Sequence, residues 1–176
     1  MILSVEEAKS FLPELSTMSD DLLKQKLGAV EVMVRKYTNN NFQNRNIRFL
    51  ADSVGTILNG SSPFLMEGDT IQVSDSRVND GLYVLKSVSD DSVVVDRPMF
   101  TVERNLVTKV EYPSDVKMGV VNLMKWDFNN RDKVGIKSET ISRHSVTYAD
   151  LDNSNQAMGY PVSLLGFLEP YKKARF

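Results

Sequence analysis

The fold of this chain is decided by one stretch, Leu82-Tyr83-Val84-Leu85-Lys86-Ser87-Val88-Ser89-Asp90-Asp91-Ser92-Val93-Val94-Val95. Two runs rich in β-branched and aromatic residues flank a short acidic turn, which predicts an antiparallel hairpin. Similar runs follow one another from about Asn46 to Tyr112, separated by clusters of Asn, Gly, Ser and Asp. We expect five or so strands there, Thr70–Ser74 and a closing strand Val107–Tyr112 among them, in a β-domain of barrel or sandwich type.

Helical patterns lie on the N-terminal side of this β segment. Ser4 and Glu7 have the spacing of a capping box, which predicts a short helix that ends near Leu12. Ser19 is expected to cap a longer helix reaching about Tyr37, because acidic residues follow in its first turn and apolar residues recur at steps of four and three. The run Thr38-Asn39-Asn40-Asn41 is expected to end that helix, since asparagine favours turns over helix interiors.

A third helix is expected after Pro113, with a broad apolar side that includes the only tryptophan, Trp126. Together the helices predict a small bundle of three to four helices, built from residues 1–45 and 113–176. The β-domain at 46–112 interrupts that bundle, so the predicted fold class is α+β.

The last forty residues have a different character. Lys137–Tyr148 alternates in the manner of a strand with a bulge or a loose hairpin, and a polar segment, Asp150–Met158, follows it. The apolar segment Pro161–Leu168 predicts a helix too short to be stable alone in water. We expect it to bury its leucines and Phe167 in a groove on a neighbouring subunit, with the basic residues of the tail at an acidic rim; a solubilising tail is the alternative.

Composition limits the classes of function. Hydrophobic residues make up 41% and charged residues 25% of the 176, the net charge is -2, and there is no cysteine. A disulfide framework and a thiolate metal site are therefore excluded, and a slightly acidic chain is a poor candidate for gripping many phosphates. Acidic residues precede any apolar run of signal-peptide length, and no apolar stretch reaches membrane-spanning length, so we expect a soluble protein made in the cytoplasm without a membrane partner.

Residues that could carry chemistry are few. His144 is the only histidine, and no nucleophile motif surrounds it. The glycines form no phosphate-binding loop, and the acidic pairs Asp20-Asp21 and Asp90-Asp91 suit a helix cap and a turn. We therefore expect no catalytic residue, no metal site and no cofactor.

Segments at the two ends of the chain follow a known pattern: Ser4-Val5-Glu6-Glu7-Ala8-Lys9, Leu22-Leu23 with Val30, a helix ending near Trp126, Lys137-Ser138-Glu139-Thr140-Ile141, Ser145-Val146-Thr147-Tyr148, Leu164-Leu165 and Leu168-Glu169-Pro170-Tyr171. In these segments the chain resembles the tailed-phage head-tail connector family, also called head-completion or neck adaptor proteins. The β segment is a departure, because shorter members have only a brief link there. We expect it to project outward and to meet the capsid, a neck partner or a neighbouring subunit.

The resemblance implies a non-enzymatic virion protein at the neck, made in the bacterial host cytoplasm. Family members are mainly helical and form a ring, typically a dodecamer, between the portal protein and a downstream neck or tail protein; double-stranded DNA passes through the ring, which helps to retain it in the head. By resemblance, the contacts to the portal or to neighbouring subunits would come from Glu139, Ile141, Arg143, Val146, Tyr148, Leu164, Leu165, Phe167, Leu168, Tyr171, Lys172, Lys173, Arg175 and Phe176.

Two other functions remain open from the sequence. A tail-terminator or minor capsid protein of the same virion would bind the tail tube rather than the portal. A phage DNA-binding regulator would need a basic recognition helix, for which the best candidate is Leu22–Tyr37 with Lys24, Lys26, Arg35 and Lys36.

Overall fold

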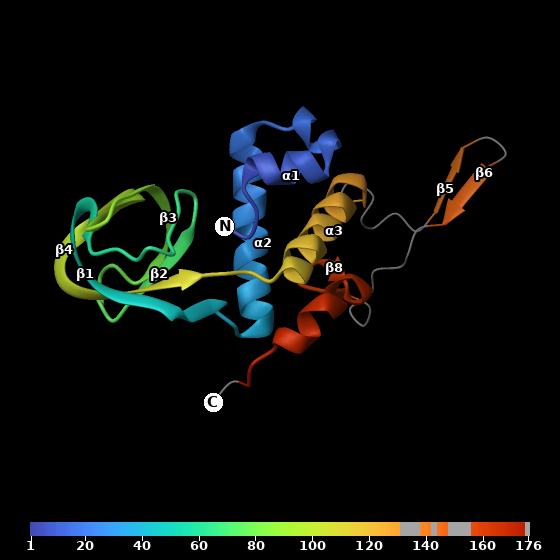
Figure 1. Cartoon of the computed structure of the whole chain (residues 1–176). Helices are drawn as coiled ribbons and strands as arrows, with labels where there is room; N and C mark the ends of the chain where they lie inside the picture. Colours follow the sequence, from blue (N-terminus) through green and yellow to red (C-terminus); the bar gives the residue numbers. More distant parts are fainter. Residues whose placement is uncertain (131–137, 142–143, 148–155, 175–176) are drawn as a thin grey trace. The chain divides into compact units, whose positions relative to one another are not determined.

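The computed structural model describes residues 1–130, 138–141, 144–147 and 156–174. The chain divides into two compact units (Figure 1). The β unit comprises Met1 and Asn41–Tyr112, and the helical unit comprises Ile2–Asn40 and Pro113–Phe176. The chain therefore has mixed α and β structure, as its sequence predicts.

The helical unit begins with two capped helices. Helix α1 spans Val5–Phe11, and the Ser4 hydroxyl and the Glu7 carboxylate cap it reciprocally as the sequence predicts. A short 3-10 helix, η1 (Pro13–Thr17), connects it to α2 (Asp20–Thr38). In Figure 1, α1 lies across one end of α2.

Helix α2 has the predicted amphipathic pattern. Four residues of its apolar stripe are buried: Leu23, Leu27, Val30 and Val34. The helix ends at Asn39, which adopts the left-handed conformation (φ 49°) and donates its backbone N–H to the Arg35 carbonyl. Asparagine tolerates this conformation better than most residues, so the predicted termination at the asparagine run is confirmed.

Helix α3 (Ser114–Asn130) and the 3-10 helix η3 (Val162–Tyr171) complete the unit. Lys26 of α2 and Asp127 of α3 form an ion pair at 2.6 Å. Gly119 gives η3 room to approach α3, because a β-carbon built there would lie 2.3 Å from the Phe167 ring. The missing side chain of Gly119 thus allows Phe167 to pack directly on the α3 backbone.

Replacing Gly119 with alanine is expected to destabilise the helical unit. The nearest ring atoms of Phe167 include Cγ at 2.5 Å, so the whole ring must move rather than its tip. Overpacking of this kind costs about 1 to 3 kcal/mol, of which the better helix propensity of alanine offsets about 1 kcal/mol. Chemical denaturation followed by Trp126 fluorescence measures the difference.

Gly28 on α2 is the matched control for Gly119. A β-carbon at Gly28 meets no atom within 4 Å, so Gly28→Ala should gain about 0.5 to 1 kcal/mol from helix propensity alone. Equal effects of the two substitutions would contradict the proposed packing of Phe167 on Gly119.

The β unit is one antiparallel sheet of four strands in the order β1-β4-β2-β3. The strands are β1 (Gln43–Asn59), β2 (Thr70–Ser74), β3 (Gly81–Val88) and β4 (Ser92–Val110). Strands β3 and β4 form the predicted hairpin, in which the Ser89 N–H donates to the Ser92 carbonyl across the turn. Strand β1 begins at Gln43, three residues before the predicted start of the β segment.

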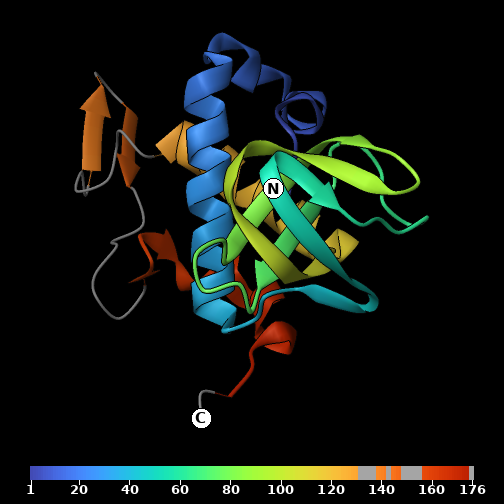
Figure 2. The same cartoon turned by 90° about the vertical axis from the view of Figure 1, so that its left-hand side faces the viewer.

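The sheet is strongly curved because β4 bends (Figure 2). The first part of β4 pairs with β3, the last part pairs with β2, and β1 follows β4 with four register shifts. Such shifts mark β-bulges or other irregularities of the pairing, and bulges increase local twist and curvature. Near the end of β1, Gly60 packs so closely on β1 itself that an added β-carbon would lie 2.9 Å from the Leu50 carbonyl oxygen.

One sequence-based prediction for the β unit is wrong. The segment Val107–Tyr112 is not a separate closing strand, since residues 107–110 belong to β4 and the sheet has four strands rather than five. The antiparallel sheet agrees with a β-domain, in which β4 pairs with each of the other three strands, and the barrel or sandwich arrangement stays a prediction. The bend in β4 brings the sheet onto itself, and packing of apolar side chains covers its inner face.

The core of the β unit combines apolar side chains with a polar network. The apolar part includes Leu58, Ile71, Val73, Leu85, Val93, Val95 and Val107. The polar network consists of three buried side chains, Ser53, Asn79 and Asn105. Asn105 Nδ2 donates to the Ala51 carbonyl, the Ser53 hydroxyl and the Val102 carbonyl, each at 3.0 Å. This network holds the strands together where the β1–β4 register is irregular.

Two small hairpins lie in the C-terminal part of the helical unit. Strands β5 (Ser138–Ile141) and β6 (His144–Thr147) pair antiparallel, which agrees with the hairpin alternative predicted for this segment. Strands β7 (Gln156–Ala157) and β8 (Tyr160–Pro161) flank the turn Met158-Gly159. Most of the polar segment Asp150–Met158 lies outside the described residues.

Candidate interaction site

The predicted C-terminal anchor packs on its own helical unit. Leu165 and Leu168 are 0% exposed within the chain, whereas Leu164 and Phe167 are half-buried. The prediction that Leu165 and Leu168 reach a groove on a neighbouring subunit is therefore wrong. The close approach of η3 to α3 at Gly119 gives these side chains a site within the same chain.

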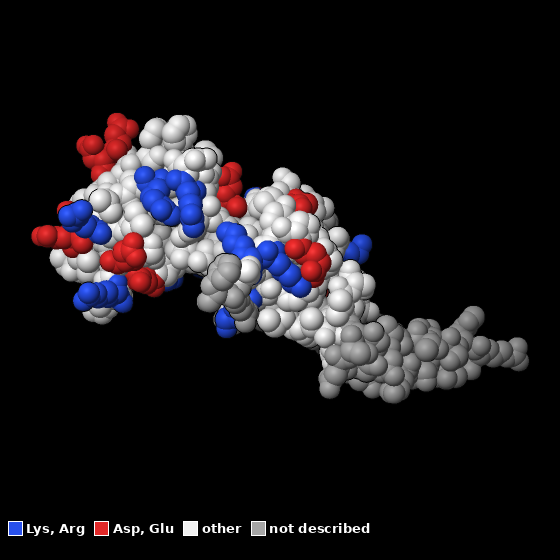
Figure 3. Space-filling view, turned by 90° about the horizontal axis from the view of Figure 1, so that it is seen from below, with Lys and Arg blue, Asp and Glu red and all other residues white. Residues whose placement is uncertain are grey.

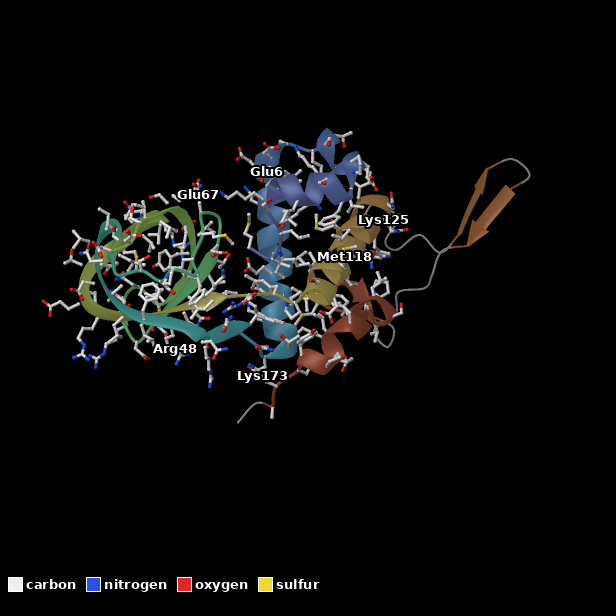
Figure 4. The ribbon with its side chains drawn as sticks, in the orientation of Figure 1. Glu6, Arg48, Glu67, Met118, Lys125 and Lys173 are labelled. Carbon is white, nitrogen blue, oxygen red and sulfur yellow. The ribbon has the colours of Figure 1, made fainter. Side chains whose placement is uncertain are left out.

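The residues after η3 are attached to the C-terminal end of α2. The backbone N–H of Lys173 donates to the Thr38 carbonyl at 2.8 Å, which satisfies one of the carbonyls left without a partner at a helix end. Asn39 Nδ2 donates to the Ala174 carbonyl at 3.0 Å, and Asn40 Nδ2 to the Tyr171 carbonyl at 3.2 Å. Figure 4 shows Lys173 at this end of α2. Residues 171–174 are therefore not a free arm, and Arg175 and Phe176 lie outside the described residues.

The charged side chains of this segment pair with one another. Lys172 Nζ donates to Glu169 Oε1 at 2.7 Å and lies 4.2 Å from the centre of the Tyr37 ring. The hydrogen bond from Lys172, with a second from Tyr37, lowers the pKa of Glu169, and the bond to Glu169 raises the pKa of Lys172. On the face drawn in Figure 3, basic and acidic side chains are interspersed among the described residues. The basic tail residues are thus partly neutralised by their own unit.

Tyr171 is expected to ionise at higher pH than an ordinary tyrosine. Its hydroxyl donates to Asp115 at 2.8 Å, and this hydrogen bond, with a contribution from desolvation, raises its pKa above 10.0. The neutral form is the one stabilised, so the contribution to stability is present below about pH 10 and is lost as the pH rises through the folded-state value. The absorbance of tyrosinate is titrated in the wild type and in Tyr171→Phe, and the difference between the two curves gives the titration of Tyr171. Asp115→Asn should move it back toward the ordinary value, and an unchanged midpoint would contradict the assignment.

The other predicted contact residues lie in or beside the β5–β6 hairpin. Its register pairs Glu139 with Val146 and Ile141 with His144. Arg143 and Tyr148 lie outside the described residues. A contact of this hairpin with the portal or a neighbouring subunit stays a prediction.

A pocket of about 300 Å³ opens in the helical unit, at a place that the sequence did not indicate. We call it the methionine pocket; it is lined by Lys26, Ala29, Val30 and Met33 of α2, Met124 and Asp127 of α3, and Met158 and Tyr160 of the β7–β8 hairpin. Its α2 residues have the spacing of one helix face, which is the only signal in the sequence. The pocket size is at the lower end for ligand sites and suits one large apolar side chain.

The walls of this pocket are adapted to an apolar group. Of the residues that line it, Met124 and Tyr160 are buried, Met33 is half-buried, and Met158 is exposed. Methionine is flexible and polarisable, so it adjusts to the shape of an apolar or aromatic partner. The one pair of opposite charges, Lys26 and Asp127, is already joined, and the pocket therefore favours a neutral occupant. Lys26, predicted as part of a basic recognition helix, has this acidic partner within the chain.

Other kinds of site are absent from the part of the chain that the structure describes. Its His, Asp and Glu residues nowhere form a group of three that could hold a metal ion. Its helices include none with the length and apolar character needed to cross a membrane.

The chain was also compared with known proteins. No protein-family model matches it, and no curated protein matches it significantly.

Proposed function

We propose that this chain is a structural virion protein, a ring-forming adaptor between the portal and the tail of a tailed phage. Its work is to bind the portal, to bind copies of itself and a downstream neck or tail protein, to let double-stranded DNA pass, and to help retain that DNA in the head. No catalysis and no cofactor are part of this role.

The observation that carries the proposal is the way the two matching ends of the chain fold. Residues 2–40 and 113–176, which contain the segments resembling the connector family, form one compact unit. The β unit, which has no counterpart in shorter members, is compact by itself and has its two ends side by side: the rings of Phe42 and Tyr112 lie 4.8 Å apart. A family core that is interrupted by an inserted domain should divide into two compact units in this way.

The direct test mixes the purified chain with the portal ring encoded by the same genome and images the product. A second ring stacked on the portal supports the adaptor. Binding to the tail tube but not to the portal would instead identify a tail-terminator or minor capsid protein. Salt-sensitive DNA binding without any ring would identify a regulator, because that dependence reports phosphate contacts.

The β unit is tested by a variant in which a short Gly-Ser linker joins Asn41 to Pro113. Because Phe42 and Tyr112 are neighbours, a few residues span the gap without stretching the chain. The variant should still stack on the portal if the helical unit alone makes that contact. Infectious particles at normal titre with this variant would exclude an essential role of the β unit in the virion.

A further inference from the structure

Phe100 is the most exposed large apolar side chain among the described residues, at 70% exposure. The backbone of Phe100 is nevertheless held by hydrogen bonds to two residues of the polar network, Ser53 and Asn79. Its N–H donates to Asn79 Oδ1 at 2.9 Å, and its carbonyl accepts from the Ser53 hydroxyl at 2.7 Å and from Asn79 Nδ2 at 2.9 Å. An exposed phenyl ring on a backbone held by three hydrogen bonds is preorganised for contact, since little conformational entropy is lost when it binds.

An exposed apolar side chain, Val54 of β1, lies on the strand segment opposite Phe100, because the register places Gly55 opposite Met99 and Ser53 opposite Val102. Leu50, also about half exposed, lies farther along β1, opposite Leu106. The inner face of the same β1–β4 ribbon is part of the core. A ribbon with apolar residues on both faces is typical of strands covered on both sides rather than of an edge that faces water.

One residue that lines the methionine pocket, Met158, has an unusual backbone conformation. Met158 has φ 54° in the two-residue turn before Tyr160, and Gly159 follows with φ 80°. Two residues with positive φ form the kind of hairpin turn that favours Asn or Gly, so methionine is disfavoured there. A large apolar side chain held at 53% exposure by a disfavoured backbone, beside a pocket lined by two other methionines, is consistent with a contact surface.

The occupant of the pocket is indicated by the charges of the two units. The β unit carries seven basic and ten acidic residues, net -3, whereas the helical unit carries fourteen and thirteen, net +1. The β unit of one copy is thus attracted to the helical unit of another and not to a second β unit. A contact between different surfaces of identical chains continues from copy to copy and closes into a ring when the rotation allows.

We propose that Phe100 of one copy inserts into the methionine pocket of the next copy, between Met33 and Met158. This inference rests on the proposed function, because the ring that the contact would build is the ring of the proposed adaptor. The phenyl ring is neutral, as the paired Lys26 and Asp127 require, and sulfur–aromatic contacts with methionine are favourable. Phe100 is then the aromatic anchor of the interface, and the exposed Val54 on the opposite segment of β1 adds apolar area beside it.

Because the chain contains no cysteine, single cysteines can be introduced to test this contact by crosslinking. Thr101→Cys beside Phe100 and Ala29→Cys at the pocket both replace exposed residues, so neither disturbs a core. Mixed copies carrying one cysteine each, distinguishable by mass, should be joined by a short bis-maleimide into heterologous dimers. Adding Phe100→Ala to the Thr101→Cys copy should weaken this association about thirtyfold, the effect of losing one well-packed aromatic anchor.

Two matched controls accompany this experiment. Phe64→Ala removes an equally prominent phenyl ring, 66% exposed in the same unit but outside the polar network, and should leave the crosslink unchanged. Ala29→Glu places a charge at the pocket and should block association with a Thr101→Cys copy, whereas Gln25→Glu adds the same charge to an exposed position of α2 outside the pocket lining and should not.

Several results would overturn the inference. These are dimers joined only through Thr101→Cys on both copies, a crosslink within a single chain when both cysteines are present, and wild-type crosslinking after Phe100→Ala. Failure of the wild-type chain to stack on the portal would count against the proposed function alone, because crosslinking between free copies reads the Phe100 contact separately. Rings that form normally on the portal with Phe100→Ala would remove the inference and leave the proposed function in place.

Discussion

Replacing Asn105 with alanine is expected to lower the free energy of unfolding of the β unit by about 3 kcal/mol or more. The Asn105 amide is fully buried and donates to the Ala51 and Val102 carbonyls and to the Ser53 hydroxyl. Alanine removes the two N–H donors of this amide, and with them all three hydrogen bonds, and leaves buried acceptors without this partner, each at a cost of about 1 to 3 kcal/mol. Hydrogen exchange of the β1 and β4 amides measures the loss directly.

Two comparisons make this prediction specific. Asn59→Ala removes the same amide at an exposed position of β1 and should change stability by less than about 0.5 kcal/mol. Trp126 is the only tryptophan and lies in the helical unit, so its fluorescence reports unfolding of that unit. Equal losses from Asn105→Ala and Asn59→Ala would show that the polar network does not stabilise the β unit.

Replacing Leu168 with alanine is expected to destabilise the helical unit by about 2 to 5 kcal/mol. The side chain is 0% exposed and belongs to η3, whose short 3-10 geometry gives little stability of its own. Loss of this packing should release η3 from α3 and expose the Trp126 environment, where the Tyr160 ring lies 5.5 Å away. Denaturation of the isolated monomer, followed by Trp126 fluorescence, is the measurement.

The exposed residue Val162 at the start of η3 is the control for Leu168. Val162→Ala should have an effect within about 0.5 kcal/mol, because the side chain loses little buried area. If Leu168→Ala left the monomer unchanged and weakened only binding to another protein, the original prediction of an external groove would be reinstated.

Local signals in the sequence predicted the helices well. The capping box at Ser4, the cap at Ser19 and the asparagine run after Thr38 each depend on residues within one turn, and all three act as predicted. The β3–β4 hairpin was also readable, because its turn separates two apolar runs. These features need no knowledge of the rest of the fold.

Features that depend on distant residues were missed. The length of β4 could not be read because Pro98 and Arg97 interrupt its apolar pattern, although the strand continues through them. Asn79 belongs to one of the polar clusters that separate the predicted strands, Asn79-Asp80-Gly81, yet its side chain is buried against Ser53, 26 residues earlier. The packing site of the short C-terminal helix could not be predicted, because Phe167 occupies the space left by the absent side chain of Gly119. In each case the partner lies far along the chain, and periodicity carries no information about it.

The paired ends of the β unit affect the order in which the chain can fold. Glu111 donates its N–H to the Phe42 carbonyl at 2.9 Å, so the folded β unit holds its own entry and exit together. Bringing α2 and α3 together in an unfolded chain closes a loop that includes residues 41–112, whereas after the β unit has folded the effective loop is only a few residues long. The difference in loop-closure entropy is worth roughly 2 to 3 kcal/mol. Folding of the β unit first therefore makes assembly of the helical unit nearly as local as that of a two-helix hairpin.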